Sequence, residues 1–280
     1  MKSFLVAGIA LILGAVIGVF IYTRFVPPPL DVMARAAAFE GNADYFFQNT
    51  SERYPTRTVS VSETRQPLAQ NEARLDGFTY EYEGETRTLA DLYTEMETSG
   101  LMIVHKGEVV HESYGRGADA GTRFTTWSLV KSITSTLVGV AVADGKIESV
   151  DDPLVKYLPE VADTAYDGVT IKQALQMSSG IRYDPDLFQG RMDDTVDFMT
   201  NSVVTGKTPA FELAIKYKRE HEPGTKFNYN TAESQVLLEL IRRVTDMDAA
   251  DYLEQKIWRP LGMEHSGEWV LDRAGVDGAE

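Results

Sequence analysis

The segment that most constrains the fold is Phe124–Gly145, FTTWSLVKSITSTLVGVAVADG. From Ile133 onward its residues are mostly apolar or small, a pattern typical of a helix that is buried on nearly all of its sides. Gly145 suits the left-handed position that follows the end of a helix. We therefore expect a buried helix that begins near Ser128 and ends before Gly145, with the rest of the chain packed around it.

Ser128 and Lys131 lie at the start of this predicted helix. Residues three apart on a helix share a face, so the lysine amine is expected beside the serine hydroxyl. A serine hydroxyl is a weak nucleophile that needs a base, and burial lowers the pKa of a lysine toward that role. Serine–lysine pairs are common on polar helices, but this pair opens an apolar one. Ser128 is thus the candidate nucleophile and Lys131 its candidate base.

A reaction of this kind also needs a group that passes a proton to the leaving amine or alcohol. Tyr229 is the best candidate, because it lies at a turn just before a predicted helix. A phenol can both donate and accept a hydrogen bond. The alternative is that Tyr229 is an aromatic side chain that packs beneath this turn.

The composition excludes several classes of function. The net charge of −15 disfavours nucleic acid and anionic lipid as partners. The absence of cysteine excludes disulfides, thiolate metal sites and a cysteine nucleophile. No pair of the 4 histidines has the H-x-x-x-H spacing of a zinc-protease helix. We therefore expect neither a metal site nor a cofactor.

An uncharged apolar run, Phe4–Tyr22, lies near the N-terminus between Lys2 and Arg24. Such a run is long enough to span a bilayer. The alternative is a cleaved signal peptide, which usually has a shorter apolar core and a small-x-small cleavage site; no such site follows Tyr22. We expect an N-terminal transmembrane helix that anchors the protein, with the bulk of the chain on the periplasmic or extracellular side.

Local signals predict several further elements. Thr88 with Asp91, and Thr170 with Gln173, have the spacing of helix capping boxes. The other predicted elements are strands over 101–105 and 108–112 joined by a Lys106–Gly107 turn, a short helical patch over 31–39, and helices over 231–246 and 249–258. A single hairpin is marginal by itself and cannot cover a buried helix. Further strands are therefore expected either within 26–85 or beyond residue 280.

These signals divide the chain into five parts. They are an anchor or signal (1–25), a linker and N-terminal extension (26–84), an α/β core with the hairpin and nucleophile helix (85–148), a helical subdomain that carries Tyr229 (149–250), and the start of a return to the α/β core (251–280).

Several motifs together resemble one known family. In order they are WSLVKSI (127–133), GKIESVDDP (145–153), YLPE (157–160), MSSGI (177–181), EPGTKFNY (222–229) and WRPLGM (258–263). This set resembles the serine β-lactamase-related superfamily of class C β-lactamases, D-alanyl-D-alanine carboxypeptidases, related esterases and 6-aminohexanoate-dimer hydrolases. It is most similar to the last branch and covers roughly residues 85 to 270.

The resemblance implies an α/β fold of the β-lactamase and penicillin-binding-protein type, with an antiparallel sheet, packed helices and a helical subdomain. It implies Ser128 as the acylated nucleophile, Lys131 as its base and Tyr229 as the proton shuttle. The Ser128 backbone N–H would be one oxyanion donor. The implied substrate is a small-molecule amide or ester, with no cofactor.

Two departures from the family pattern leave other interpretations open. The family motif Y-x-N has asparagine two residues after the tyrosine, where this chain has Thr231, and Asn230 stands one place early. The family's third motif, of the K-T-G or H-x-G kind, is not found before Glu280, so the C-terminal strands of the sheet are expected to be missing. The alternatives are a non-catalytic, membrane-tethered binding or sensor domain on the same fold, and an inactive fragment.

Overall fold

The computed structural model describes residues 43–52, 54–71, 75, 77–184, 194–272, 275 and 278. The predicted transmembrane helix over Phe4–Tyr22 and the helical patch over 31–39 lie outside these residues. Within the described ranges, no helix combines the length and the apolar character that crossing a bilayer requires.

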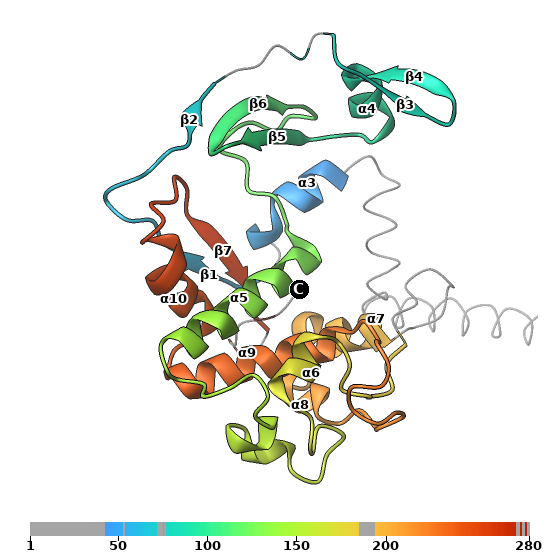
Figure 1. The fold of residues 1–280 in the computed structure, drawn as a ribbon, viewed down its shortest axis with the longest axis vertical. Helices are drawn as coiled ribbons and strands as arrows, with labels where there is room; N and C mark the ends of the chain where they lie inside the picture. Colours follow the sequence, from blue (N-terminus) through green and yellow to red (C-terminus); the bar gives the residue numbers. More distant parts are fainter. Residues whose placement is uncertain are drawn as a thin grey trace, which may run out of the picture.

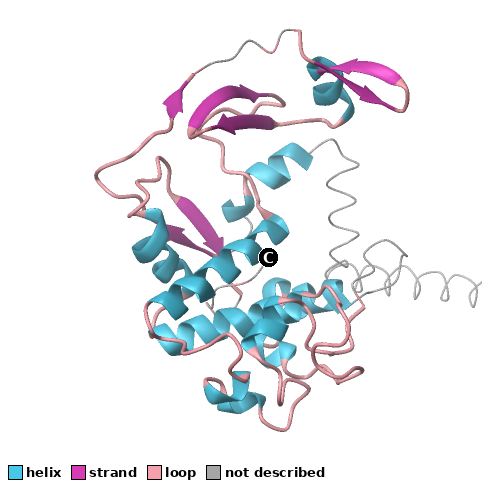
Figure 2. Cartoon of the chain, in the orientation of Figure 1, coloured by secondary structure: helices cyan, strands magenta, loops and turns pink. Residues whose placement is uncertain are grey.

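Most strands lie at the top of the molecule and most helices at the bottom, with the remaining strands in the middle beside the helices (Figures 1 and 2). The helices are α3 (Ala43–Gln48), α4 (Leu89–Glu95), α5 (Val130–Ala143), α6 (Ile171–Leu175), α7 (Asp194–Met199), α8 (Ala210–Ala214), α9 (Thr231–Thr245) and α10 (Ala249–Leu253). The strands are β1 (Thr56–Val59), β2 (Ala69–Gln70), β3 (Thr79–Tyr82), β4 (Glu85–Thr88), β5 (Gly100–His105), β6 (Glu108–Tyr114) and β7 (Gly267–Val270).

The strands of the described residues form three small sheets in place of the single antiparallel sheet that we expected. The sheets are β2-β6-β5, β1-β7 and β3-β4. All pairs are antiparallel except β2 with β6, which is parallel and only two residues long. The predicted β5–β6 hairpin is confirmed. Its turn has positive φ at Lys106 (53°) and Gly107 (82°), as the right-handed twist of a two-residue hairpin loop requires.

The helical region holds most of the hydrophobic core. α9 lies at its centre and packs against α5, α6 and α8. Every residue of α9 from Thr231 to Ile241 is buried. Both predicted capping boxes are confirmed, at Thr88 for α4 and at Thr170 for α6, because each threonine accepts from the N3 backbone while the N3 side chain accepts from the cap N–H.

The helix α5, which follows Ser128, is buried on one side only. Its buried residues are Val130, Thr134, Leu137, Val138 and Ala141, and its main helical partners are α9 and α10. Residues on the opposite side, Ser132, Ser135, Thr136 and Gly139, are exposed. The prediction that this helix is buried on nearly all sides is therefore wrong for this face. Small side chains carry little apolar surface, so their exposure to water costs little free energy.

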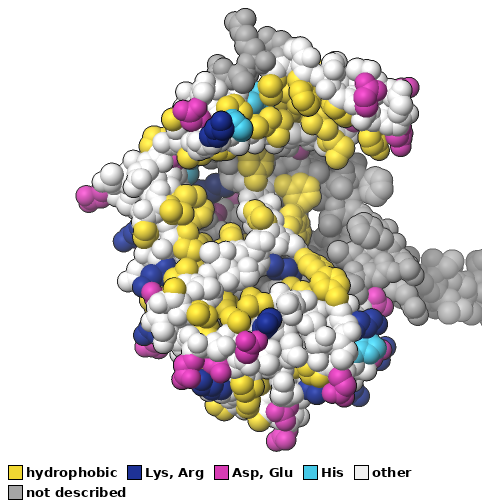
Figure 3. All heavy atoms as spheres, viewed as in Figure 1, with side chains coloured by type: hydrophobic (Ala, Val, Ile, Leu, Met, Phe, Trp, Pro, Cys, Tyr) yellow, Lys and Arg dark blue, Asp and Glu magenta, His cyan; other side chains and the backbone are white. Residues whose placement is uncertain are grey.

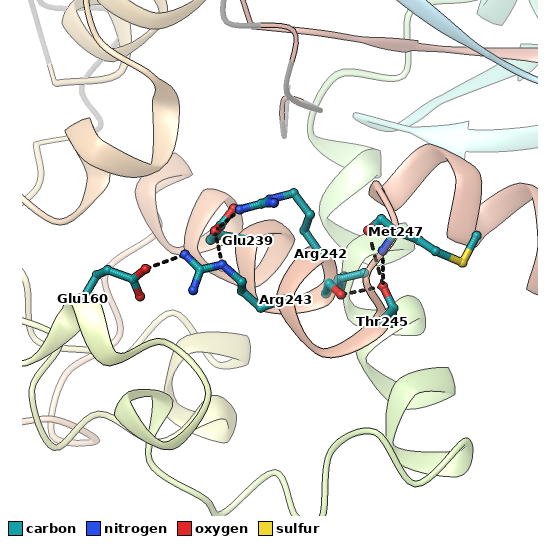
Figure 4. Close-up of polar contacts among 7 residues, drawn as sticks. Glu160, Glu239, Arg242, Arg243, Thr245 and Met247 are labelled. Atoms are coloured by element: carbon teal, nitrogen blue, oxygen red, sulfur yellow. Dashed lines mark hydrogen bonds and ion pairs between the residues drawn. The ribbon is translucent and has the colours of Figure 1, made fainter.

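An ion-pair cluster around the buried Glu239 ties the second half of α9 to the 3-10 helix at Pro159–Val161 (Figure 4). Glu239 is only 6% exposed and pairs with Arg242 at 2.6 Å and with Arg243 at 3.0 Å. Arg243 also reaches Glu160 across the helical region. Because both carboxylate oxygens of Glu239 accept from Arg242, its buried charge is compensated.

Candidate functional site

Ser128 lies in the short 3-10 helix η2 (Trp127–Leu129), directly before α5. Its side chain is exposed, whereas Lys131 in the first turn of α5 is half-buried. Lys131 Nζ donates a hydrogen bond to Ser128 Oγ at 3.2 Å. The predicted pair is thus in direct contact, because η2 leads into α5 without a break and sets the two side chains on one side of the turn.

Tyr229 reaches the same place from the other side. It lies in the turn before α9, the helix that packs against α5. Lys131 Nζ is 5.4 Å from the centroid of the Tyr229 ring, within range of a cation–π contact. Tyr229 is 42% exposed, so a ligand from solvent has access to it. The structure therefore brings all three predicted residues together, with the lysine amine in contact with both partners.

The residue before Ser128 has an unusual backbone conformation. Trp127 has φ +45°, a region that bulky side chains rarely adopt and that costs of order 1–3 kcal/mol. Two contacts from the end of α3 hold it. The ring of Phe47 meets that of Trp127 edge-on at 6.1 Å, and the Phe47 carbonyl accepts from the Thr125 N–H and hydroxyl, both at 2.9 Å. Nothing in a Thr-Trp-Ser sequence signals positive φ, so this strained turn could not be predicted from the sequence.

The turn that carries Tyr229 is held on both sides of the tyrosine. The Asn228 N–H donates to the Met177 carbonyl at 2.8 Å. Asn230 is the N-cap of α9, where its Oδ1 accepts from the Glu233 N–H at 2.8 Å. Thr231 is 2% exposed and is the first residue of α9. The side chains that replace the asparagine of Y-x-N are therefore part of the helix start.

The MSSGI segment (177–181) fits against the chain that precedes Tyr229. Gly180 has φ +83°, and its carbonyl accepts from the N–H groups of Glu220 at 2.8 Å and His221 at 3.0 Å. A Cβ at Gly180 would lie 2.1 Å from the His221 carbonyl oxygen, so only glycine fits here.

Glu233 is a buried carboxyl group beneath this turn that sequence analysis missed. It is 1% exposed, and burial raises its pKa to about 7, although the hydrogen bonds from Ser179 act in the opposite direction. A glutamate three residues after Asn230 fits an ordinary helix-start pattern. Its hydrogen bonds with Ser179 could not be predicted from the sequence, because the two residues lie far apart in the chain.

A hollow of about 1090 Å³ adjoins the Ser128 turn through Trp127. Val130 and Ile133 of α5 line one part of it, and Trp258 and Trp269 line another. Figure 3 shows hydrophobic side chains gathered around the hollow between the strands and the helical region. Within the described ranges, no three histidine or carboxylate side chains are grouped to hold a metal ion.

Comparisons with known proteins identify the family of this chain. The Beta-lactamase family matches residues 87–274. The chain is 28% identical over 239 residues to the 6-aminohexanoate-dimer hydrolase of Paenarthrobacter ureafaciens, covering 82% of this chain and 58% of that protein. It is 24% identical over 194 residues to the "Putative D-alanyl-D-alanine carboxypeptidase" of Escherichia coli (strain K12), covering 59% of this chain and 42% of that protein.

The fold is also similar to a solved structure. The "Putative 6-aminohexanoate-dimer hydrolase from Bacillus anthracis" matches with a TM-score of 0.75 at 20% identity, covering 85% of this chain and 64% of that one. This match confirms the predicted α/β fold over the covered part. The chain spans less than two thirds of the length of each of these relatives.

Proposed function

The chain belongs to the beta-lactamase family, and on that premise we propose that it is a serine hydrolase that cleaves an amide or ester through an acyl-enzyme on Ser128. One observation supports this proposal above the others: Lys131 Nζ lies 3.2 Å from Ser128 Oγ and 5.4 Å from the ring centroid of Tyr229. Acyl transfer to serine requires a nucleophile, a base and a proton donor that lie close together.

In the acylation step, Lys131 acts as the base and takes the proton of the Ser128 hydroxyl as Oγ attacks the substrate carbonyl carbon. The tetrahedral intermediate carries its negative charge on the former carbonyl oxygen, where the Ser128 backbone N–H is one donor. Tyr229 passes a proton to the leaving nitrogen or oxygen as the bond to carbon breaks. Lys131 returns its proton to Tyr229, which restores both groups.

In the deacylation step, water attacks the Ser128 ester, and the same groups run in reverse. Lys131 takes the proton of the attacking water, either directly or through Tyr229, which gives its phenolic proton to Lys131 as it accepts that of the water. Ser128 Oγ then leaves with this proton from Lys131. The products are a carboxylic acid and the free enzyme. The exposure of Ser128 and Tyr229 supports this step, because water reaches both.

For the substrate, we propose a short amide. The two named relatives are called a 6-aminohexanoate-dimer hydrolase and a D-alanyl-D-alanine carboxypeptidase, and each name describes cleavage of an amide bond in a small linear molecule. Hydrolysis of the 6-aminohexanoate dimer and of a peptide ending in D-alanyl-D-alanine should be measured side by side. Cleavage of simple esters alone would shift the proposal to an esterase.

Covalent labelling tests the nucleophile. The wild-type chain, treated with a fluorophosphonate, should gain the mass of one adduct by intact-mass measurement. Ser128→Ala should gain none. Ser132→Ala is the matched control, because Ser132 is exposed on the next turn of the same helix and has no role in the mechanism, and it should label like wild type. Equal labelling of wild type and Ser128→Ala would contradict the assignment.

Acylation rates test the other two residues. Lys131→Ala should slow acylation by about 10²–10⁴-fold, the usual cost of losing a general base. Tyr229→Phe keeps the ring but removes the phenolic proton, so acylation by an amide should fall while the cation–π contact with Lys131 is kept. An unchanged rate in either variant would remove that residue from the mechanism.

The non-catalytic alternatives have their own signatures. Failure of wild type to label, together with cooperative urea unfolding, would favour a binding or sensor domain on this fold. Failure to label together with non-cooperative unfolding would favour an inactive fragment.

We also propose that Phe4–Tyr22 anchors the hydrolase in a membrane, with the catalytic region on the periplasmic or extracellular side. Its length and lack of charge support an uncleaved helix. The expressed chain should stay in the membrane fraction after alkaline carbonate washing and keep its N-terminal mass. A soluble chain shortened at its N-terminus would favour a cleaved signal peptide.

A further inference from the structure

Glu233 is placed where a carboxyl group is difficult to accommodate. It is the third residue of α9, four positions after Tyr229, and it is 1% exposed. The mechanism above does not use it. A buried carboxyl group without a structural or chemical task is rare, because removing its charge from water is costly.

The two oxygens of the Glu233 carboxyl group have different surroundings. Oε1 accepts from the Ser179 N–H at 3.2 Å and from the Ser179 hydroxyl at shorter range. Oε2 is buried and has no hydrogen-bond partner among the described residues. The same is true of the hydroxyl groups of Tyr166 and Ser234. A carboxyl group with two donors on one oxygen and none on the other has a natural place for a proton on the second.

The groups that face Glu233 offer no positive charge. The titratable group near Glu233 is the phenol of Tyr166, from the segment before α6, and the phenols of Tyr183 and Tyr217 lie near Tyr166 in turn. Burial, followed by the nearby Glu233, raises the pKa of Tyr166 well above its ordinary value, so this phenol stays neutral. In the described part of the chain, no ion pair joins Glu233 to a lysine or arginine. Glu239 on the same helix differs, because Arg242 and Arg243 both pair with it.

Ser179 connects Glu233 to the turn that carries Tyr229. Ser179 belongs to the 177–181 segment, in which the Met177 carbonyl accepts from the Asn228 N–H at 2.8 Å. The Asn228 side chain donates to the Tyr183 carbonyl at 2.9 Å, just beyond this segment. Asn228, the residue before Tyr229, is therefore held by the 177–181 segment, which Glu233 binds through Ser179. Asn230, the residue after Tyr229, is the N-cap of α9, the helix that contains Glu233.

We propose that Glu233 is a positioning residue for Tyr229, and that it acts as a neutral carboxylic acid whose proton lies on Oε2. This proposal rests on the proposed function, in which Tyr229 moves a proton. In the neutral form, Glu233 fixes the 177–181 segment against α9 without burying a charge. In the ionised form, the same place holds an uncompensated negative charge, which favours opening of the segment toward water.

The pKa of Glu233 agrees with this geometry. Burial raises it to about 7, with the hydrogen bonds from Ser179 lowering it in part. The carboxyl group is therefore neutral in mildly acidic solution and ionises as the pH rises through about 7. The position of Tyr229 should loosen over the same range.

Two variants and one control test the proposal on the full chain. Glu233→Gln copies the neutral acid, since its amide oxygen can accept from Ser179. Glu233→Ala removes the hydrogen bonds with Ser179. Glu239→Gln is the control, a buried glutamate of the same helix that is paired with arginine and lies away from Tyr229. The rate of Ser128 acylation by the 6-aminohexanoate dimer, an amide whose leaving amine takes its proton from Tyr229, is measured from pH 5.5 to pH 9 for each chain.

At pH 6, Glu233→Gln should acylate within about threefold of wild type, and Glu233→Ala should be about 10–100-fold slower, the scale of a misplaced catalytic group. The ratio of the Glu233→Gln rate to the wild-type rate should rise as pH passes through about 7. The corresponding ratio for Glu239→Gln should stay constant. A flat ratio for Glu233→Gln, or a loss at pH 6 as large as that of Glu233→Ala, would overturn the proposal.

Hydrogen exchange separates this proposal from the proposed function. The backbone amides of residues 228–231, corrected for intrinsic exchange, should lose protection above about pH 7 in wild type and keep it in Glu233→Gln. This readout does not depend on acylation. No labelling of wild type would therefore refute the hydrolase alone, whereas equal protection in the two chains at all pH values would refute the role of Glu233.

Discussion

The helical region and the strand region of this molecule differ sharply in how far they are packed. In the helical region, from α5 to α10, most apolar side chains are buried, many of them completely. Between Ala69 and Tyr114, Val109 is the only buried side chain among the described residues. In β5, Met102 is 49% and Val104 48% exposed. This difference indicates that the helical region supports the proposed site, because its packing fixes the positions of Lys131 and Tyr229.

The largest effect should come from two glycines with nearly the same φ, Gly180 (+83°) in the helical region and Gly107 (+82°) in the β5–β6 turn. An added Cβ would overlap the His221 carbonyl at Gly180 and would meet nothing within 4 Å at Gly107. Gly180→Ala should cost up to about 5 kcal/mol, strain and overpacking together, and Gly107→Ala about 1 kcal/mol, strain alone. Urea unfolding measures both. Similar costs would mean that the two regions do not differ in packing at these turns.

Truncation of one apolar side chain in each region should give the next effect. Leu240 in α9 is fully buried, whereas Val104 in β5 is 48% exposed. Leu240→Ala should lower the free energy of unfolding by about 3 kcal/mol because it leaves a cavity. Val104→Ala should change it by less than about 0.5 kcal/mol. A loss above about 1 kcal/mol at Val104 would show that β5 is covered in solution.

The pH dependence of stability should sharpen the comparison within the helical region. The pKa of Glu233 is raised from 4.5 to about 7 in the folded protein, so the unfolded chain releases this proton first as pH rises. Its stabilising effect is complete below pH 4.5 and is lost between pH 4.5 and 7, a change of about 3 kcal/mol.

Glu233→Gln removes this titration. Its free energy of unfolding relative to wild type should therefore rise by about 3 kcal/mol from pH 4.5 to pH 8, as followed by urea unfolding at each pH. Glu239→Gln provides the reference for loss of a buried, ion-paired glutamate. A difference between Glu233→Gln and wild type that does not change with pH would contradict the shifted pKa.

The smallest effect concerns the two capping boxes, which have the same chemistry in different surroundings. Thr170 starts α6 within the helical region and is half-buried, whereas Thr88 starts α4 and is exposed. Thr170→Ala should cost about 1–2 kcal/mol and Thr88→Ala about 0.5 kcal/mol. Circular dichroism during urea unfolding reports both. A larger loss of unfolding free energy at Thr88 than at Thr170 would contradict the expected difference between the two regions.

The parts of the fold that the sequence predicts are those fixed by local chemistry. The capping residues Thr88 and Thr170, the Lys106–Gly107 turn and the apolar period of α9 each act within a few residues. Further strands were expected within 26–85, where β1 lies, but the positions of β1 and β7 could not be predicted, because each has four residues and pairs with the other across the length of the chain. The three-sheet arrangement and the exposed face of α5 likewise depend on contacts that no local pattern carries.

The candidate site divides in the same way. Helical spacing alone predicts the contact of Ser128 with Lys131. Tyr229 was placed by its turn and by the family resemblance, and the α5–α9 packing that brings it to Lys131 is a tertiary contact. Glu233 and the strained Trp127 could not be predicted, because both depend on partners from distant parts of the chain, Ser179 and Phe47.

The exposed strand β5 has a consequence for how this protein must be handled in solution. Among the described residues, its outer edge has no partner strand, and Met102, Ile103 and Val104 carry apolar side chains along it. Such an edge can pair with the same edge of another copy. Repulsion between two copies, each with a net charge of −15, opposes this pairing. Salt screens the repulsion, because the Debye length falls from about 10 Å at 0.1 M to about 3 Å at 1 M. Self-association should therefore increase with ionic strength, so low-salt buffers are the better choice for keeping the chain monomeric.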